Sequence, residues 1–177
     1  SLLKNKTFPP NFTVGGQNFS YIVISPQFKT WPNAGNVNAL ITYIVSKLRI
    51  DKSRIYVTGL SMGGGVTWDY AGSKFGYKVA AIVPVCGATG PSDSKAKIIA
   101  SNHLPVWAFH NQYDDKVSYY NTVNWVNSIN KYSPNPKPRI TIFQDPDKGH
   151  DAWTKAYSLT YKENNMNVFE WMLQYHK

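Results

Sequence analysis

Residues 54–72 read RIYVTGLSMGGGVTWDYAG, and this stretch decides the fold. Its first six residues are mostly β-branched or aromatic and predict a short strand that stops at Gly59. The residues from Met62 to about Lys74 predict a helix. Between strand and helix the sequence fits the pattern Gly-x-Ser-x-Gly, with the serine at Ser61. The stretch therefore predicts a strand, a sharp glycine-bounded turn and a helix.

In this setting the turn is typical of a nucleophile elbow, in which a strained serine stands exposed at the carboxyl end of a sheet. Such a turn needs residues without bulky side chains two before and two after the serine, and Gly59 and Gly63 meet that need. The Met62 backbone N–H, freed at the helix start, could stabilise an oxyanion. The competing interpretations are a turn with an idle serine and a phosphate-binding loop, but both phosphate-loop patterns are absent. We interpret Ser61 as a nucleophile.

The composition is that of an ordinary globular protein. The 177 residues suit a single domain, residues 1–177, with 42% hydrophobic and 16% charged residues. No apolar run approaches the roughly 20 residues that cross a bilayer, so we expect no membrane partner. The net charge of +9 comes from scattered lysines with only three arginines, which favours a solvated basic surface over a nucleic-acid partner. The single cysteine, Cys86, excludes an internal disulfide and a cysteine-based zinc site, and we expect no metal or cofactor.

Strand and helix patterns alternate along the chain and predict the α/β class. Buried strands are predicted at 20–26, 54–59, 79–87, 104–111 and 139–144, and helices at 37–48, 62–74, 93–102, 117–132 and 162–177. Near-continuous apolar strands separated by amphipathic helices are typical of a mostly parallel sheet with helices on both faces.

A nucleophilic serine needs a base and an acid that orients it. His150 follows the last predicted strand, in a loop at the sheet edge of Ser61, and is our candidate base. His110 ends the strand before it, and we interpret this residue as shaping the loop that follows. That loop offers adjacent carboxylates at Asp114 and Asp115, of which only one can face His150. The order serine, aspartate, histidine is that of α/β-hydrolases.

Three segments resemble the α/β-hydrolase esterases, a group that includes feruloyl and acetyl-xylan esterases, polyhydroxybutyrate depolymerase-like enzymes and related predicted peptidases. They are RIYVTGLSMGGGVTWDYA, PVWAFHNQYDDKVS and GHDAW, and the likeness runs from about residue 20 onward. The family loop usually reads His-Gly-x-x-Asp. Aligning it on His110 implies Asp114 as the acid, with Asp115 second and Asn111 in place of the family glycine. The resemblance also places Trp68 and Trp153 at family positions, as candidate substrate-binding residues.

The chain departs from this family at its N-terminus. Family members carry further strands there and a loop that supplies a second oxyanion N–H, and nothing in this chain matches them. We therefore expect a fragment that begins after that loop, with residues 1–6 continuing a helix.

The resemblance and the site residues together predict a serine carboxylic-ester hydrolase that works through an acyl-enzyme. Its substrates would be acyl esters, such as those of plant polysaccharides, and such an enzyme would be secreted or periplasmic. Two alternatives stay open: a serine peptidase or amidase, and a catalytically incomplete hydrolase fold that binds without turnover. The oligomeric state is not predicted.

Overall fold

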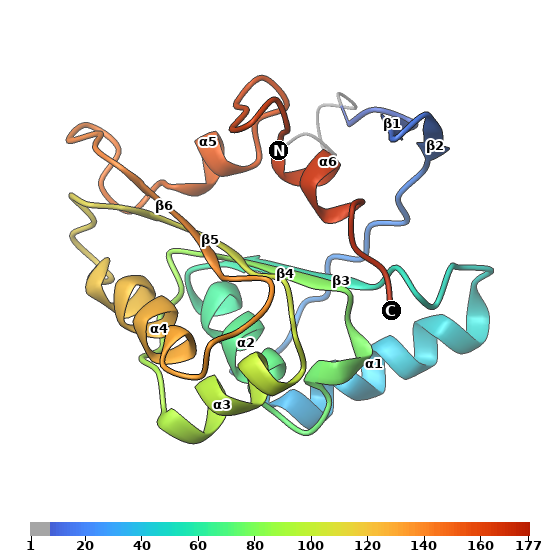
Figure 1. Ribbon diagram of the computed structural model, residues 1–177, viewed down its shortest axis with the longest axis horizontal. Helices are drawn as coiled ribbons and strands as arrows, with labels where there is room; N and C mark the ends of the chain where they lie inside the picture. Colours follow the sequence, from blue (N-terminus) through green and yellow to red (C-terminus); the bar gives the residue numbers. More distant parts are fainter. Residues whose placement is uncertain (1–7) are drawn as a thin grey trace.

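The computed structural model describes residues 8–177, and its centre is a parallel four-stranded sheet (Figure 1). The strands lie in chain order, β3, β4, β5 and β6. Their bounds are β3 Tyr56–Leu60, β4 Ala81–Val85, β5 Trp107–Asn111 and β6 Arg139–Phe143. The main helices that connect them are α2 Met62–Ala71, α3 Asp93–Ser101 and α4 Tyr120–Asn130, while a short 3₁₀ turn covers Gly76–Lys78. All ladders between these strands are parallel, as the sequence predicts.

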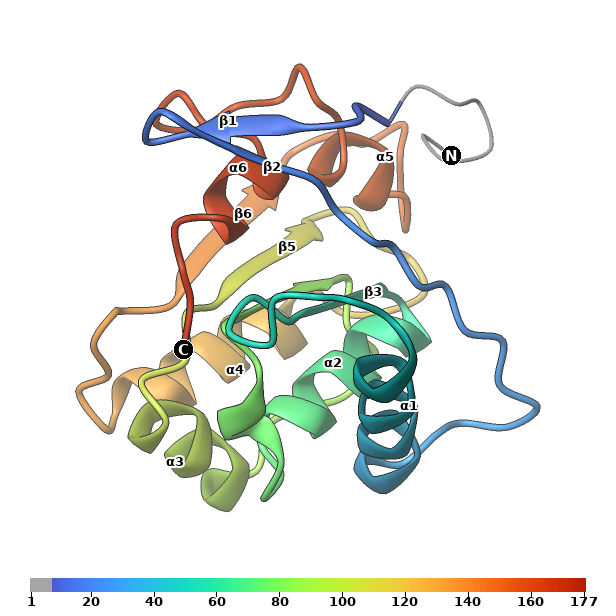
Figure 2. The same ribbon diagram turned by 90° about the vertical axis from the view of Figure 1, so that its right-hand side faces the viewer.

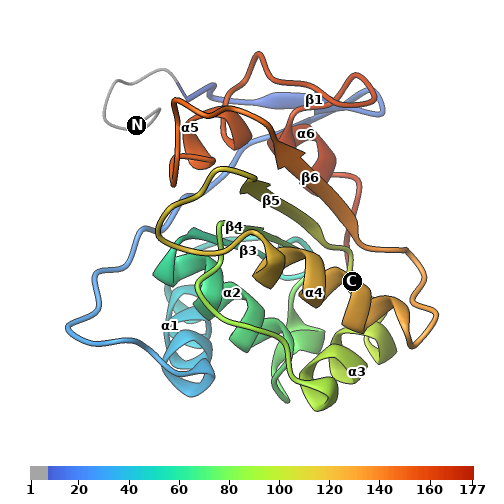
Figure 3. The same ribbon diagram turned by 90° about the vertical axis from the view of Figure 1, so that its left-hand side faces the viewer.

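Both faces of the sheet are covered, and β4 shows why. All five residues of β4 are buried, and successive side chains point to opposite faces. Ile82 packs into the cluster formed with α2, α3, α4 and the preceding helix α1, Ala34–Lys47. Val83 and Val85 pack into a second cluster with α5, Trp153–Ala156, and α6, Val168–Met172. Figures 2 and 3 show α1 to α4 on one side of the sheet and α5 and α6 on the other.

Side-chain caps account for where several helices begin. Asn33 and Asn36 form a reciprocal capping box at the start of α1, with both hydrogen bonds at 3.0 Å. The Ser92 hydroxyl accepts from the Lys95 N–H at the start of α3. Because the first N–H groups of a helix lack internal partners, each cap satisfies donors that would otherwise be unpaired.

The predicted strand at 20–26 is wrong. Among the described residues the segment pairs with no strand, and Ile22, Val23 and Ile24 are 52%, 44% and 43% exposed. Only Tyr21 is anchored, by its ring against Tyr56 and by its hydroxyl, which donates to a backbone oxygen of α6. A β-branched apolar run has strand propensity, but it forms a strand only where another backbone lies beside it.

The chain ends also differ from the prediction. A two-stranded antiparallel hairpin, β1 Phe12–Val14 and β2 Gln17–Phe19, precedes the exposed segment and was not predicted. The last helix is much shorter than 162–177, because Asn167 caps it and the two residues Asn164 and Asn165 adopt positive φ just before. The predicted helix at residues 1–6 lies outside the described residues. No helix within residues 8–177 combines the length and the apolar character that a membrane span requires.

Candidate active site

Ser61 stands at the junction of β3 and α2 in a backbone conformation that few residues adopt. Its φ is 54° and its ψ is −116°. Three hydrogen bonds hold this turn: the Ser61 N–H donates to Val85 O at 3.0 Å, and the Ser61 carbonyl accepts from Gly65 N–H at 3.0 Å and Ala88 N–H at 3.1 Å. The serine backbone is thus tied to its own helix and to the loop after β4. A residue keeps such a strained backbone conformation only where the surrounding structure holds it there. Strain of this kind is typical of functional sites.

Close backbone approach explains two glycines of the turn. A Cβ on Gly59 would collide with the backbone of Gly63, and a Cβ on Gly64 would meet Val85 O at 2.5 Å. A Cβ on Gly63 would meet no atom within 4 Å. A single Cβ is therefore accommodated at position 63, and the expectation that a bulky side chain is excluded there stays a prediction. The glycine that lets α2 lie against the end of β4 is Gly64, which the five-residue pattern does not include.

A continuous hydrogen-bond path joins Ser61, His150 and Asp114. Nε2 of His150 lies 2.9 Å from the Ser61 Oγ, and Nδ1 lies 2.6 Å from Oδ2 of Asp114. A carboxylate only accepts, so Nδ1 carries the proton and Nε2 is free to accept from the serine hydroxyl. Ser61 lies in the turn after β3, Asp114 in the loop after β5 and His150 in the loop after β6. They meet because the carboxyl ends of parallel strands share one edge of the sheet.

Asp114 is the acid that the structure brings to His150, and Asp115 is not. The Asp114 side chain is fully buried, and its Oδ1 accepts from the backbone N–H groups of Lys116 and Val117, both at 2.9 Å. Burial raises the pKa of Asp114, but the hydrogen bonds from Val117, His150 and Lys116 outweigh it and leave the pKa below its ordinary value. Asp115 points to solvent, 63% exposed, and pairs with Lys116.

Comparison with known proteins agrees with this geometry. No protein-family model matches the chain. A solved structure described as a thermostable esterase superposes with a TM-score of 0.66 and 29% identity, over 80% of this chain and 36% of the esterase chain. The chain has the α/β-hydrolase fold. This confirms the fold class and the resemblance to α/β-hydrolase esterases that the sequence indicates.

Two further relatives extend the comparison. The bifunctional acetylxylan esterase/xylanase XynS20E of Neocallimastix patriciarum is 30% identical over 108 residues, which are 56% of this chain and 15% of that protein. A candidate dienelactone hydrolase from Klebsiella pneumoniae subsp. pneumoniae MGH 78578 superposes with a TM-score of 0.55 and 19% identity, over 74% of this chain and 55% of its own. The chain thus spans well under two thirds of each of these relatives. The dienelactone hydrolase supports the fold alone.

The hydrolase fold leaves the Met62 N–H available beside Ser61. Met62 is the first residue of α2, so its N–H has no partner within the helix. Within residues 8–177 no hydrogen bond from this N–H is formed. The role of Met62 as an oxyanion donor stays a prediction, as does the lack of a second donor.

The two predicted substrate-binding tryptophans lie in different environments. Trp68 is 0% exposed and stacks on Trp125, with ring centroids 4.7 Å apart and planes within 5°. A side chain without exposed surface cannot touch a substrate, so this prediction for Trp68 is wrong. Trp68 faces the core because it lies on the buried side of α2. Trp153 is half-buried at the start of α5, with its ring edge-on to His150 at 5.4 Å.

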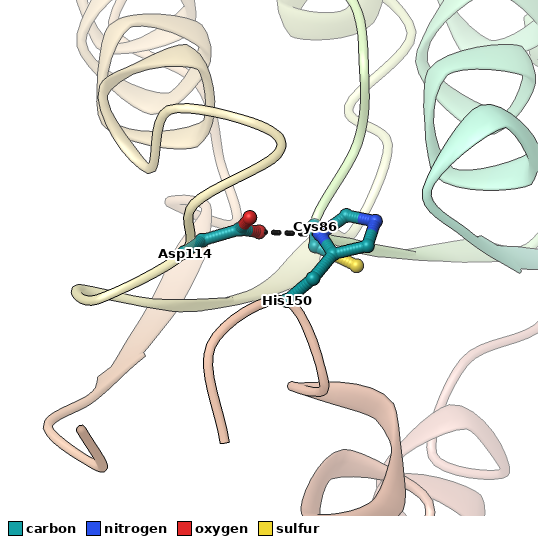
Figure 4. A group of neighbouring side chains, drawn as sticks. All are labelled: Cys86, Asp114 and His150. Carbon is teal, nitrogen blue, oxygen red and sulfur yellow. Dashed lines mark hydrogen bonds and ion pairs between the residues drawn. The ribbon is translucent and has the colours of Figure 1, made fainter. Parts of the chain in front are cut away.

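Cys86 lies beside the hydrogen-bonded pair His150 and Asp114. Figure 4 shows the Asp114 carboxylate pointing to the His150 ring, with the Cys86 sulfur close to the same ring. Ligand atoms of the three residues lie within 4.8 Å of one another. The donor set suits a metal poorly. Both Asp114 oxygens already accept hydrogen bonds, and burial raises the pKa of the Cys86 thiol to about 12, whereas a metal binds the thiolate. Cys86 is better described as a small buried residue of the second core cluster.

His110 contacts the loop after β5 that the sequence assigns it to shape, and it also contacts the candidate acid, which was not expected. Its ring is fully buried and its Nε2 lies 3.0 Å from the same Asp114 oxygen that His150 approaches. The spacing of four residues between His110 and Asp114 was visible in the sequence. The opposite partner of the ring, Thr122 on α4, was not, because no local pattern links a helix residue to that loop.

Proposed function

We propose that this chain is a serine hydrolase that cleaves carboxylic esters through an acyl-enzyme. The observation that carries the proposal is the unbroken path from Ser61 Oγ through His150 to the Asp114 carboxylate, with heavy-atom distances of 2.9 and 2.6 Å. Both distances lie within hydrogen-bonding range, so no rearrangement is needed before proton transfer.

In the acylation step the Ser61 oxygen attacks the ester carbonyl carbon while its proton passes to His150 Nε2. The imidazolium that forms is stabilised by the Asp114 carboxylate at Nδ1. Negative charge develops on the carbonyl oxygen, where the free Met62 N–H would donate. The carbon–oxygen bond to the alcohol then breaks, and His150 returns its proton to that leaving group.

Deacylation repeats the sequence with water. His150 takes a proton from the water, whose oxygen attacks the acyl carbon on Ser61. The second tetrahedral intermediate collapses to the free acid, and the proton on His150 restores the Ser61 hydroxyl. The side chains end in their starting protonation states, so no cofactor is consumed.

We further propose an acyl ester of a plant polysaccharide as the substrate. Two comparisons support this class: the similar solved structure is described as an esterase, and the relative XynS20E is named as an acetylxylan esterase/xylanase. Trp153, half-buried beside His150, is suitably placed to contact a sugar or acyl group. A polysaccharide substrate also fits a secreted or periplasmic enzyme.

The first experiment is labelling with a fluorophosphonate probe, followed by peptide mass spectrometry. We expect a single adduct on Ser61, absent in Ser61→Ala and retained in Ser94→Ala, which changes an exposed serine of α3. An adduct that persists in Ser61→Ala would overturn the mechanism, and no adduct on the wild-type chain would favour a non-catalytic binding protein. Matched acetyl ester and acetamide substrates then separate an esterase from an amidase.

A further inference from the structure

His110 is buried at the end of β5, beside Asp114, and both of its ring nitrogens form hydrogen bonds. Nε2 lies 3.0 Å from Asp114 Oδ2 and 2.9 Å from the Val117 carbonyl oxygen, while Nδ1 lies 2.8 Å from the Thr122 hydroxyl. Both partners of Nε2 accept only, so Nε2 carries the proton and donates to both. Nδ1 then accepts from Thr122. The hydrogen bonds thus identify the neutral His110 tautomer with its proton on Nε2.

The charge state of His110 follows from the same surroundings. The ring has no exposed surface, and burial lowers the pKa of His110 below its ordinary value. The ionisable groups that face it are Asp114 and, beyond that carboxylate, His150. Asp114 already carries the negative charge that a protonated His150 requires during catalysis. A neutral His110 donates to the carboxylate without placing a second positive charge beside His150.

We propose that His110, oriented by Thr122, is a positioning residue. It holds the Asp114 carboxylate in the orientation that accepts the hydrogen bond from His150 Nδ1. The proposal rests on the function proposed above. Asp114 Oδ2 accepts from both histidines, while Oδ1 accepts from the backbone of residues 116 and 117. His110 also donates to the Val117 carbonyl. It therefore links the carboxylate to the loop whose backbone N–H groups, at residues 116 and 117, donate to the same carboxylate. Without this donor the carboxylate keeps its bonds to the loop and to His150 but loses one of the two hydrogen bonds that hold Oδ2.

The sharpest test is a pair of substitutions that differ by one methylene. In His110→Gln the side-chain amide reaches the place of Nε2 and donates to Asp114. In His110→Asn the shorter amide reaches only the Thr122 side of the ring. His176→Gln, in an exposed residue near the C-terminus, is the matched control. Thermal unfolding of each variant separates a fold defect from a site defect.

Two measurements read out positioning. One is the rate of fluorophosphonate labelling of Ser61, which we expect to fall about tenfold or more in His110→Asn and little in His110→Gln, because small displacements in an active site are costly. The other is the proton NMR resonance of the His150 Nδ1–H, which we expect to weaken or move upfield in His110→Asn alone. The proposal would be overturned if the Asn and Gln variants had the same labelling rate and the same His150 Nδ1–H resonance. It would also be overturned if His110→Asn kept the wild-type rate and resonance.

Two provisions keep the test decisive. If His110→Asn does not fold, Thr122→Val removes only the hydroxyl that orients the ring, and an unchanged rate and resonance there would contradict the proposal. If the wild-type chain takes no label, the proposed function fails. The NMR resonance needs no turnover, so it still decides whether His110 positions Asp114.

Discussion

The Nδ1 atom of His150 lies 2.6 Å from Oδ2 of Asp114, a carboxylate with no exposed surface. The two residues are 36 positions apart and follow neighbouring strands, β5 and β6. A buried carboxylate is costly unless hydrogen bonds compensate for the lost water, and Asp114 is compensated by four donors. The cost of desolvation is thereby offset where the negative charge can act on His150.

Asp114→Asn should lower the rate of ester hydrolysis by about 10³- to 10⁴-fold, because an amide can hold His150 in the wrong tautomer. Asp115→Asn should leave the rate near that of the wild type, since Asp115 contacts only Lys116 at the surface. Steady-state kinetics with an aryl acetate compares the two. Equal losses in both variants would mean that the acid has been assigned to the wrong residue.

Gly59→Ala should lower the free energy of unfolding by about 2–4 kcal/mol, because the new Cβ collides with backbone that cannot move independently of α2. Gly63→Ala should change it by less than about 1 kcal/mol, as its Cβ meets open space in a helix that favours alanine over glycine. Urea unfolding followed by circular dichroism measures both. A larger loss in Gly63→Ala would contradict the described packing of the turn.

The two tryptophans should respond in different measurements. Trp68→Phe removes part of a fully buried stack, so we expect it to lower the free energy of unfolding by about 1–3 kcal/mol and to leave KM unchanged. Trp153 lies beside His150 at the edge of the site, so we expect Trp153→Ala to raise KM. Because Trp153 also packs against the second core cluster, the free energy of unfolding should fall as well. A Trp68→Phe variant with normal stability and a raised KM would contradict the conclusion that Trp68 is a core residue without substrate contact.

Cys86 should resist alkylation in the folded protein. Burial raises the pKa of its thiol to about 12, so at pH 8 the group is protonated and lacks the thiolate that reacts. A thiol with a raised folded pKa stabilises the fold below its unfolded pKa of about 8.5, and this contribution is lost as the pH rises toward 12. Iodoacetamide with mass detection should modify Cys86 at pH 8 only in denaturant. Rapid modification of the native chain would show that the thiol is accessible.

Much of the site could be predicted from local sequence because its parts are local structures. The turn at Ser61 depends on a strand pattern, small residues and a helix pattern that follow one another directly. The chain order of Ser61, Asp114 and His150 places each residue after a strand, and parallel strands bring such residues to one edge. The β4 and β5 segments were equally clear, since both are apolar throughout and buried on both faces.

The rest depends on contacts between segments far apart in the sequence. Residues 20–26 have the composition of a strand, yet no described backbone pairs with them, and Trp68 is buried because of how α2 packs on α4. The sequence by itself determined the elbow, the order of the proposed triad and the α/β class. The family resemblance already favoured Asp114 over Asp115, but only the tertiary structure showed Asp114 beside His150, Trp68 in the core and His110 behind the carboxylate. The physical reason is that pattern and propensity act over a few residues, whereas burial and side-chain hydrogen bonds require partners that folding alone brings together.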